Sequence, residues 1–225
     1  MKAKIYIITS LFIILFSSCK KNDLNNSVKE NTYQVLSVLH HDLSRYKMIY
    51  SAFQPLPPDP NSNISWDSIK KLMELDRSIE KDTVKIVDAL IKKNGRLIVA
   101  IDSILTPNWA DNIKNIKHHQ GYGKLLEQFS SNKDTVNINV SKITSNKYAF
   151  IIPYREDYQF LGRKGYDKFH IHLSFSKVEF NKEKNKAIVI MGASFGKLNG
   201  FSSIYFLEKK NGNWIIKYEN GLSIS

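Results

Sequence analysis

The chain has 225 residues, of which 42% are hydrophobic and 12% aromatic. This composition supports a folded globule and excludes a disordered or low-complexity protein. The formal charge is +12, and most of the basic excess lies in residues 131–225, where 15 Lys and Arg residues outnumber eight Asp and Glu residues. Such a charge favours anionic partners, namely lipid head groups, acidic glycans, acidic proteins or nucleic acid, although a lysine-rich composition also serves solubility alone.

The first 19 residues form the clearest motif of the sequence. Lys2 and Lys4 precede an apolar stretch over 5–16, which is too short for a membrane span of about 20 residues and is typical of a signal peptide. The stretch ends in Leu15-Phe16-Ser17-Ser18-Cys19, and these small residues before a cysteine resemble the lipobox of bacterial lipoproteins. The ending departs from the commonest form of that motif, which has Leu in place of Phe16 and Gly or Ala in place of Ser18.

The resemblance implies a lipid anchor at Cys19. In bacterial lipoproteins the cysteine thiol receives a diacylglyceryl group, a signal peptidase cuts before the cysteine, and the new amine is acylated, for example with palmitate. The lipid bilayer is then a partner of the chain, and the cell envelope is its expected location. Lys20 stands where Asp often retains such proteins at the inner membrane, so the outer membrane is favoured. Because Cys19 is the only cysteine, an internal disulfide is excluded, and lipidation of Cys19 would also exclude a Cys/His protease and a Cys-based zinc site.

The segment after the leader changes from polar to amphipathic. Residues 20–31 are polar and predict a flexible tether that leaves the bilayer. Over 32–53, apolar residues recur at spacings of three and four, which predicts an amphipathic helix. Neighbouring helical residues point in different directions, so His40 and His41 are interpreted as surface or partly packed residues.

Helices predominate in the next hundred residues. A second helix is predicted over 64–75 and a third over 82–93, which Asn94-Gly95 ends because Gly suits a left-handed C-terminal position. The other elements expected before residue 153 are a buried strand over 97–101, a weaker helix over 113–129, and strands over 136–140 and 148–152.

Consecutive strands separated by turns are predicted over 166–224. Apolar and polar residues alternate over 169–175, while 187–191 is a continuous apolar run, typical of a central strand covered on both faces. Asn211-Gly212 suits the positive φ values of a two-residue hairpin turn. Helices that precede strands indicate the α+β class, with N-terminal helices packed on a C-terminal antiparallel sheet that forms a meander.

The closing hairpin over 205–217 resembles that of many uncharacterised secreted bacterial proteins, some of them cystatin-like or nuclear transport factor 2-like. The resemblance implies a curved sheet wrapped on a helix and no particular activity. Three parts are expected: a signal peptide over 1–18, the lipidated cysteine with its tether over 19–31, and one α+β domain over 32–225. Within the domain, the helical part reaches about residue 130 and the sheet occupies 131–225.

One segment combines cations with aromatic residues and is the best candidate for a contact surface. Arg side chains bind carboxylate or phosphate in bidentate fashion, and aromatic faces stack on sugar rings or bases. The alternative is a loop whose aromatic residues are buried and whose cations are only solvated. Nucleic acid is not expected as a partner, because a lipid anchor keeps the protein in the envelope. The candidate contact residues are Arg155, Tyr158, Arg163, Lys164, Tyr166 and Lys168.

His170 and His172 lie two residues apart, so a strand places both imidazoles on one face, within reach of one metal ion. Zinc requires at least a third protein ligand, and His118 and His119 supply one only if the fold brings them near. A solvent-exposed pair is the simpler interpretation, so no metal or other cofactor is expected. The sequence contains no Ser-His-Asp signature motif.

These observations favour a non-catalytic lipoprotein of the cell envelope that binds an anionic envelope partner. No catalytic residue is assigned. Two alternatives remain open at this point: an envelope hydrolase that uses His170 or His172, and an inhibitor or immunity-type binding protein.

Overall fold

The computed structural model describes residues 26–42, 83–107, 113, 116, 119–160, 168–195 and 200–224. Residues 26–42 are helical throughout. The remaining helices are α4 (Thr83–Asn94), α5 (Gly123–Ser131), α6 (Asp157–Phe160) and a 3-10 turn over Val140–Lys142. The strands are β1 (Leu97–Ile101), β2 (Ile104–Leu105), β3 (Val136–Asn137), β4 (Ala149–Pro153), β5 (Ile171–Phe175), β6 (Glu179–Phe180), β7 (Lys186–Ser194), β8 (Gly200–Lys210) and β9 (Asn213–Ile224).

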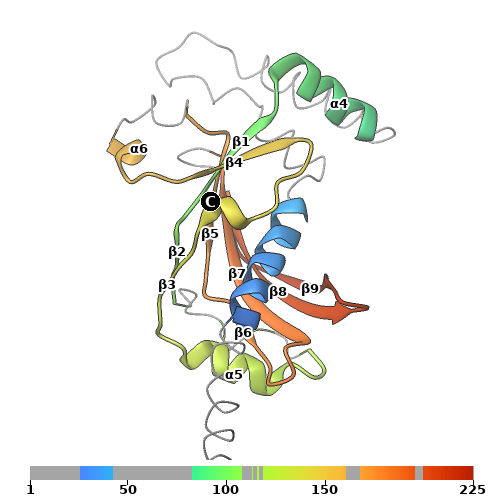
Figure 1. The fold of residues 1–225 in the computed structure, drawn as a ribbon, viewed down its shortest axis with the longest axis vertical. Helices are drawn as coiled ribbons and strands as arrows, with labels where there is room; N and C mark the ends of the chain where they lie inside the picture. Colours follow the sequence, from blue (N-terminus) through green and yellow to red (C-terminus); the bar gives the residue numbers. More distant parts are fainter. Residues whose placement is uncertain are drawn as a thin grey trace, which may run out of the picture.

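Seven of the strands form one sheet in the order β4-β1-β5-β7-β8-β9, with β6 paired to β7 (Figure 1). The expected α+β class is confirmed. The expected antiparallel meander is correct only for β5, β7, β8 and β9, because β1 pairs in parallel with both β4 and β5. The sheet is therefore mixed.

The position of β1 explains this correction. Its sequence, Leu-Ile-Val-Ala-Ile, is apolar at every position, as is common in strands with parallel neighbours. A buried strand was predicted at these residues, within the otherwise helical part of the chain, and that prediction is confirmed. Its neighbours were not predicted, because β1 is inserted between two strands from the later part of the chain. The sheet therefore includes a strand that precedes residue 130.

The two faces of the sheet have separate hydrophobic clusters. Val35, Leu36 and Leu39 of the helix over 26–42 pack on one face, and Figure 1 shows this helix (blue) lying across β7 and β8. The α5 helix packs on the other face through Leu125, Leu126 and Phe129. Because side chains alternate along a strand, β7 contributes to both clusters, which accounts for its continuous apolar run.

The start of the first helix differs from the sequence-based boundary. Residues 26–31, assigned above to the flexible tether, are helical, and Asn31 is buried. The Asn31 Oδ1 atom accepts hydrogen bonds from Lys209 Nζ (2.8 Å) and Trp214 Nε1 (3.1 Å). Polar residues in this segment therefore make tertiary contacts. The polar composition alone, from which a tether was predicted, does not reveal such contacts.

Turn chemistry in the chain agrees with the predictions. Gly95 ends α4 with φ at +82°, and Asn211 and Gly212 both have positive φ values between β8 and β9. Trp214 is buried and Ile216 partly buried on one face of β9, while Ile215 is exposed on the other, as expected from strand alternation.

Two elements differ from the prediction. The weaker helix begins at Gly123 rather than at residue 113, because Gly121 adopts a φ of +80° just before it. The strand expected over 136–140 ends at Asn137, and the 3-10 turn replaces it, with the Asn139 side chain accepting from Ser141 N. The helix predicted over 64–75 lies outside the described residues.

Candidate functional site

The carboxyl ends of β1 and β4 bring together polar residues that lie far apart in the sequence. Asp102 directly follows β1, Tyr154 directly follows β4, and His172 lies in β5. Backbone hydrogen bonds continue one residue beyond each strand, from Asp102 N to Leu173 O (3.1 Å) and from Tyr154 N to Ile101 O (2.8 Å). These bonds fix the positions from which the side chains of Asp102 and Tyr154 project.

Asp102 and His172 form a close pair. The distance between Asp102 Oδ1 and His172 Nε2 is 2.9 Å, and the two side chains are 29% and 24% exposed. When Nε2 donates this bond, Nδ1 carries the lone pair and is the basic nitrogen of the ring. The pair is thus partly open to solvent and is chemically able to accept a proton or a hydrogen bond from a ligand.

Aromatic rings surround the imidazole of His172. The Tyr154 ring stacks on it, with centroids 3.9 Å apart and an interplanar angle of 19°. Tyr158 and Phe169 each meet Tyr154 edge to face, with centroids 5.8 Å apart. Phe169 is buried, whereas Tyr154 and Tyr158 are half-buried. We call Tyr154, Tyr158, Phe169 and His172 the aromatic cluster.

Two of the cations predicted to contact a partner, Arg155 and Lys168, are among the described residues, and both lie next to members of this cluster in the sequence. Arg155 is exposed and makes a bidentate ion pair with Asp157, through Nε (3.0 Å) and Nη2 (2.9 Å). This pairing raises the pKa of the Arg155 guanidinium, so the side chain stays charged. Lys168 is exposed next to Phe169. Arg163, Lys164 and Tyr166 lie outside the described residues.

His170 has a structural partner of its own. Its Nδ1 atom accepts a hydrogen bond from Ile98 N (2.8 Å), and its backbone N–H donates to Ile98 O (2.8 Å). Burial lowers the pKa of its imidazole. The imidazole of His170 is therefore hydrogen-bonded to β1, and the imidazole of His172 is hydrogen-bonded to Asp102, the residue that follows β1.

The histidines considered as a third metal ligand do not join this pair among the described residues. His119 stacks on Tyr218 (4.0 Å between centroids), and its Nε2 lies 3.2 Å from Asn220 Oδ1 in β9. His118 lies outside the described residues. Within the part of the chain that the structure describes, no three His, Cys, Asp or Glu side chains are grouped in a way that could hold a metal ion.

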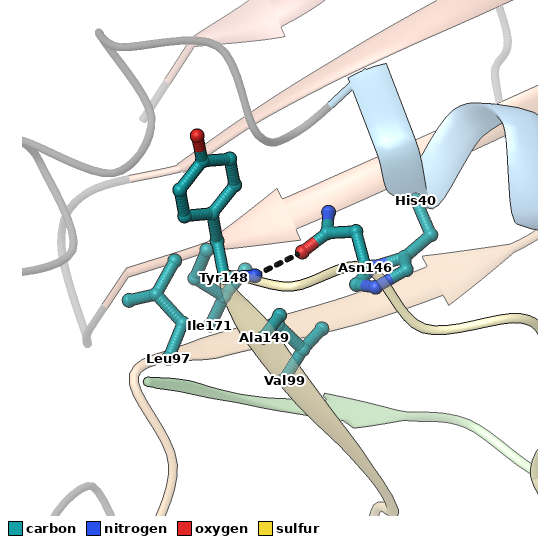
Figure 2. Close-up of a pocket in the computed structure, with 7 residues that line it drawn as sticks. All are labelled: His40, Leu97, Val99, Asn146, Tyr148, Ala149 and Ile171. Carbon is teal, nitrogen blue, oxygen red and sulfur yellow. Dashed lines mark hydrogen bonds between the residues drawn. The ribbon is translucent and has the colours of Figure 1, made fainter. Parts of the chain in front are cut away.

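A second candidate is a small cavity beneath the helix over 26–42. Figure 2 shows the His40 imidazole and the Asn146 amide on its wall, together with apolar residues of β1, β4 and β5. The cavity leaves about 10 Å³ for the centre of a water molecule, roughly the space that one water needs. His40 was interpreted as a surface or partly packed residue, but it is only 1% exposed, because the helix turns it towards the sheet.

The environment of His40 favours the neutral imidazole. Neither ring nitrogen has a hydrogen-bond partner among the described residues. Burial, with a smaller contribution from the neighbouring His41, lowers the pKa of His40 to about 4. The cavity is therefore a place for a single polar molecule the size of water rather than a substrate pocket.

Sequence reasoning did not single out Asp102. The available signal was its position, directly after a buried strand, where polar side chains of α/β sheets gather at the carboxyl edge. The parallel partners of β1 were not predicted, so no edge was recognised. Cys19 lies outside the described residues, and among those that the structure does describe, no helix has the length and apolar character of a membrane span.

Comparisons of the chain with protein-family models, with curated proteins and with solved structures find no match.

Proposed function

We propose that this protein is a lipoprotein of the bacterial cell envelope, anchored through acyl groups on Cys19, whose α+β domain binds an anionic envelope partner without catalysis. The observation that carries the anchor is the leader, with its two lysines, its short apolar stretch and Ser17-Ser18 before the only cysteine. More than one acyl chain holds a protein on a bilayer far more firmly than a single chain, because each buried CH₂ contributes about 0.8 kcal/mol.

Metabolic labelling tests the anchor. Cells that express the full chain are grown with a labelled fatty acid, and the protein is isolated with detergent. We expect label on the wild type and none on Cys19→Ala, since the thiol is the acceptor. Ser18→Ala is the matched control and should be labelled, because Ala is common at that position in the motif. Equal labelling of wild type and Cys19→Ala would exclude an anchor at this residue.

The aromatic cluster supports the binding part of the proposal. Half-buried rings of Tyr154 and Tyr158 offer apolar faces. Lys168 supplies positive charge beside them, and Arg155 lies there in its ion pair with Asp157. The tyrosine rings are held by one another, so a partner meets a surface that is already ordered, which lowers the entropic cost of binding. Aromatic residues and Arg dominate the energetics of many interfaces.

Co-purification from detergent extracts tests this surface. We expect Arg155→Gln combined with Lys168→Gln to lose a partner that the wild type retains. Lys92→Gln combined with Lys93→Gln, in the last turn of α4, removes the same charge elsewhere and should retain it. If both double variants retain the partner equally, the contact surface lies elsewhere.

A hydrolase is the second candidate, and the Asp102–His172 pair is the observation that favours it. Ser194 of β7 is the register partner of His172 on β5, so its side chain projects from the same face of the sheet. The carboxylate of Asp102 follows β1, and the imidazole of His172 and the hydroxyl of Ser194 lie on the next two strands of the sheet, β5 and β7. Nucleophilic catalysis uses these groups when the imidazole removes the hydroxyl proton during attack on an acyl ester.

Activity on chromogenic acyl esters separates the two candidates. The binding proposal expects no hydrolysis by the wild type above that of Ser194→Ala. Hydrolysis that is lost in both Ser194→Ala and His172→Asn, and kept in Ser174→Ala on the same strand face, would replace the binding proposal with the hydrolase.

A further inference from the structure

Three segments meet at one end of the sheet. Residues 26–31, at the start of the helix over 26–42, contact the end of β8 through the bond from Lys209 Nζ to Asn31 Oδ1 (2.8 Å). The turn over 181–185, between β6 and β7, joins them through the bond from Lys209 N to Asn185 O (2.7 Å). We call these segments, with residues 209–213 and Lys142, the lysine end.

The lysine end is strongly basic. Its acidic residues are Glu30 and Glu183. None of the ion pairs between described residues involves Lys29, Lys182 or Lys210, and all three are exposed. The lysines of this end are Lys29, Lys142, Lys182, Lys184, Lys209 and Lys210.

A groove between the helix and the β8–β9 turn opens at the same end. Lys29, Lys142 and Asn213 are among the residues that line it, and its volume is about 740 Å³. Sites for small molecules commonly have volumes of about 300–1,000 Å³, so a phospholipid head group fits. Lys29 and Lys142 place positive charge on this lining, which suits the phosphate of a head group.

The length of chain before the helix limits where this end can lie. Only residues 20–25 separate Cys19 from Asn26, the first described residue. Seven residue steps span at most about 25 Å when fully extended. If Cys19 carries the anchor proposed above, on which this inference rests, Asn26 and the lysine end beside it stay within that distance of the bilayer.

We propose that the lysine end docks on the anionic phospholipid surface that surrounds the anchor. Each lysine held near such a surface strengthens the association about fivefold, which corresponds to about 1 kcal/mol. Salt weakens the contact, since the Debye length is about 8 Å at physiological ionic strength.

Docking also orients the candidate site. β7 runs from Lys186, beside the lysine end, to Ser194, the register partner of His172. Eight residue steps along a strand cover about 27 Å. The aromatic cluster is therefore carried away from the bilayer, towards soluble partners.

Spin labelling of the acylated full chain tests the docking. Acylation consumes the only native thiol, so an introduced cysteine is the single labelling position. Asn213→Cys places the label at the lysine end, and Ala89→Cys on α4 is the matched control; both positions are exposed. The chain is reconstituted in phosphatidylcholine vesicles with or without phosphatidylglycerol, and lipids with a nickel-chelating head group report proximity through faster spin relaxation.

We expect strong relaxation at residue 213, but not at residue 89, only in vesicles that contain phosphatidylglycerol. High salt should abolish this relaxation. The triple variant Lys29→Gln, Lys182→Gln and Lys210→Gln should abolish it too. The control triple variant Lys92→Gln, Lys93→Gln and Lys147→Gln should retain it. Equal relaxation at both positions, or relaxation independent of phosphatidylglycerol, would overturn the docking. Loss of the anchor is distinguishable, because unacylated chain does not remain with the vesicles and Cys19 itself takes the label.

Discussion

At the scale of single residues, His40 is the most unusual feature of the described chain. A helix that packs on a sheet commonly buries aliphatic side chains, and its neighbours Leu36 and Leu39 follow that rule. An imidazole at the same interface is tolerated in its neutral form, because a charged ring without a partner has a large desolvation cost. The residues that line its cavity include Asn146 and Tyr148 but no carboxylate.

This environment predicts that His40 makes folding sensitive to acid. The pKa is about 4 in the folded chain and 6.5 for an unperturbed histidine, so between these values the unfolded chain binds more protons. The free energy of unfolding is therefore not reduced by His40 above about pH 6.5. It falls as the pH decreases towards 4, and His40 accounts for up to about 3 kcal/mol of that loss. Urea denaturation at several pH values should show this loss in the wild type and a much smaller one in His40→Leu.

A control separates the buried ring from its exposed neighbour. His41→Asn removes the charge next to His40 but keeps the buried imidazole, so most of the acid sensitivity should remain. A His40→Leu chain that loses stability as steeply as the wild type would show that other groups cause the acid sensitivity.

At the scale of elements, the junction between the first helix and the closing hairpin depends on one amide. Asn31 Oδ1 accepts from both Trp214 and Lys209, and its Nδ2 donates to Ser27 O (2.9 Å). The Lys209 ammonium also lies over the Trp214 ring, 5.6 Å from its centroid. A single polar side chain thus connects residues more than 170 positions apart in the sequence.

Asn31→Ala should therefore destabilise the protein. Removal of the amide leaves the buried indole N–H of Trp214 without its acceptor, at a cost of about 1–3 kcal/mol. Gln34→Ala on the same helix removes only an exposed bond to Glu30 (3.4 Å) and should change stability by less than about 0.5 kcal/mol. Equal midpoints of urea denaturation for the two variants would show that the Asn31 bonds contribute little.

At the scale of the whole molecule, β1 holds the two parts of the chain together. It pairs with β4, about 50 residues later, and with β5, about 70 residues later. Such pairing forms only after long loops have closed, which is slow compared with the local hairpin of β8 and β9. The same strand carries Asp102 to His172, so the pairing that completes the sheet also assembles the candidate site.

Features that depend on neighbouring residues could be predicted from the sequence. The proposed leader is a contiguous motif. Gly95, Asn211 and Gly212 indicated turns, because their positive φ values depend on the residue itself and its neighbours. The continuous apolar run over 187–191 indicated a strand covered on both faces. The α+β class and the closing hairpin were predicted correctly, because both follow from local patterns along the chain.

Only the tertiary structure decided the arrangement of β1, the burial of His40 and the Asp102–His172 pair. The two members of that pair are separated by 70 positions, and no local pattern specifies which strands become neighbours in a sheet. Periodicity shows that a strand or helix has an apolar face, but the identity of the segment that covers it depends on packing of the whole chain. Motifs read along the chain therefore predicted the anchor, while the site required contacts between distant strands.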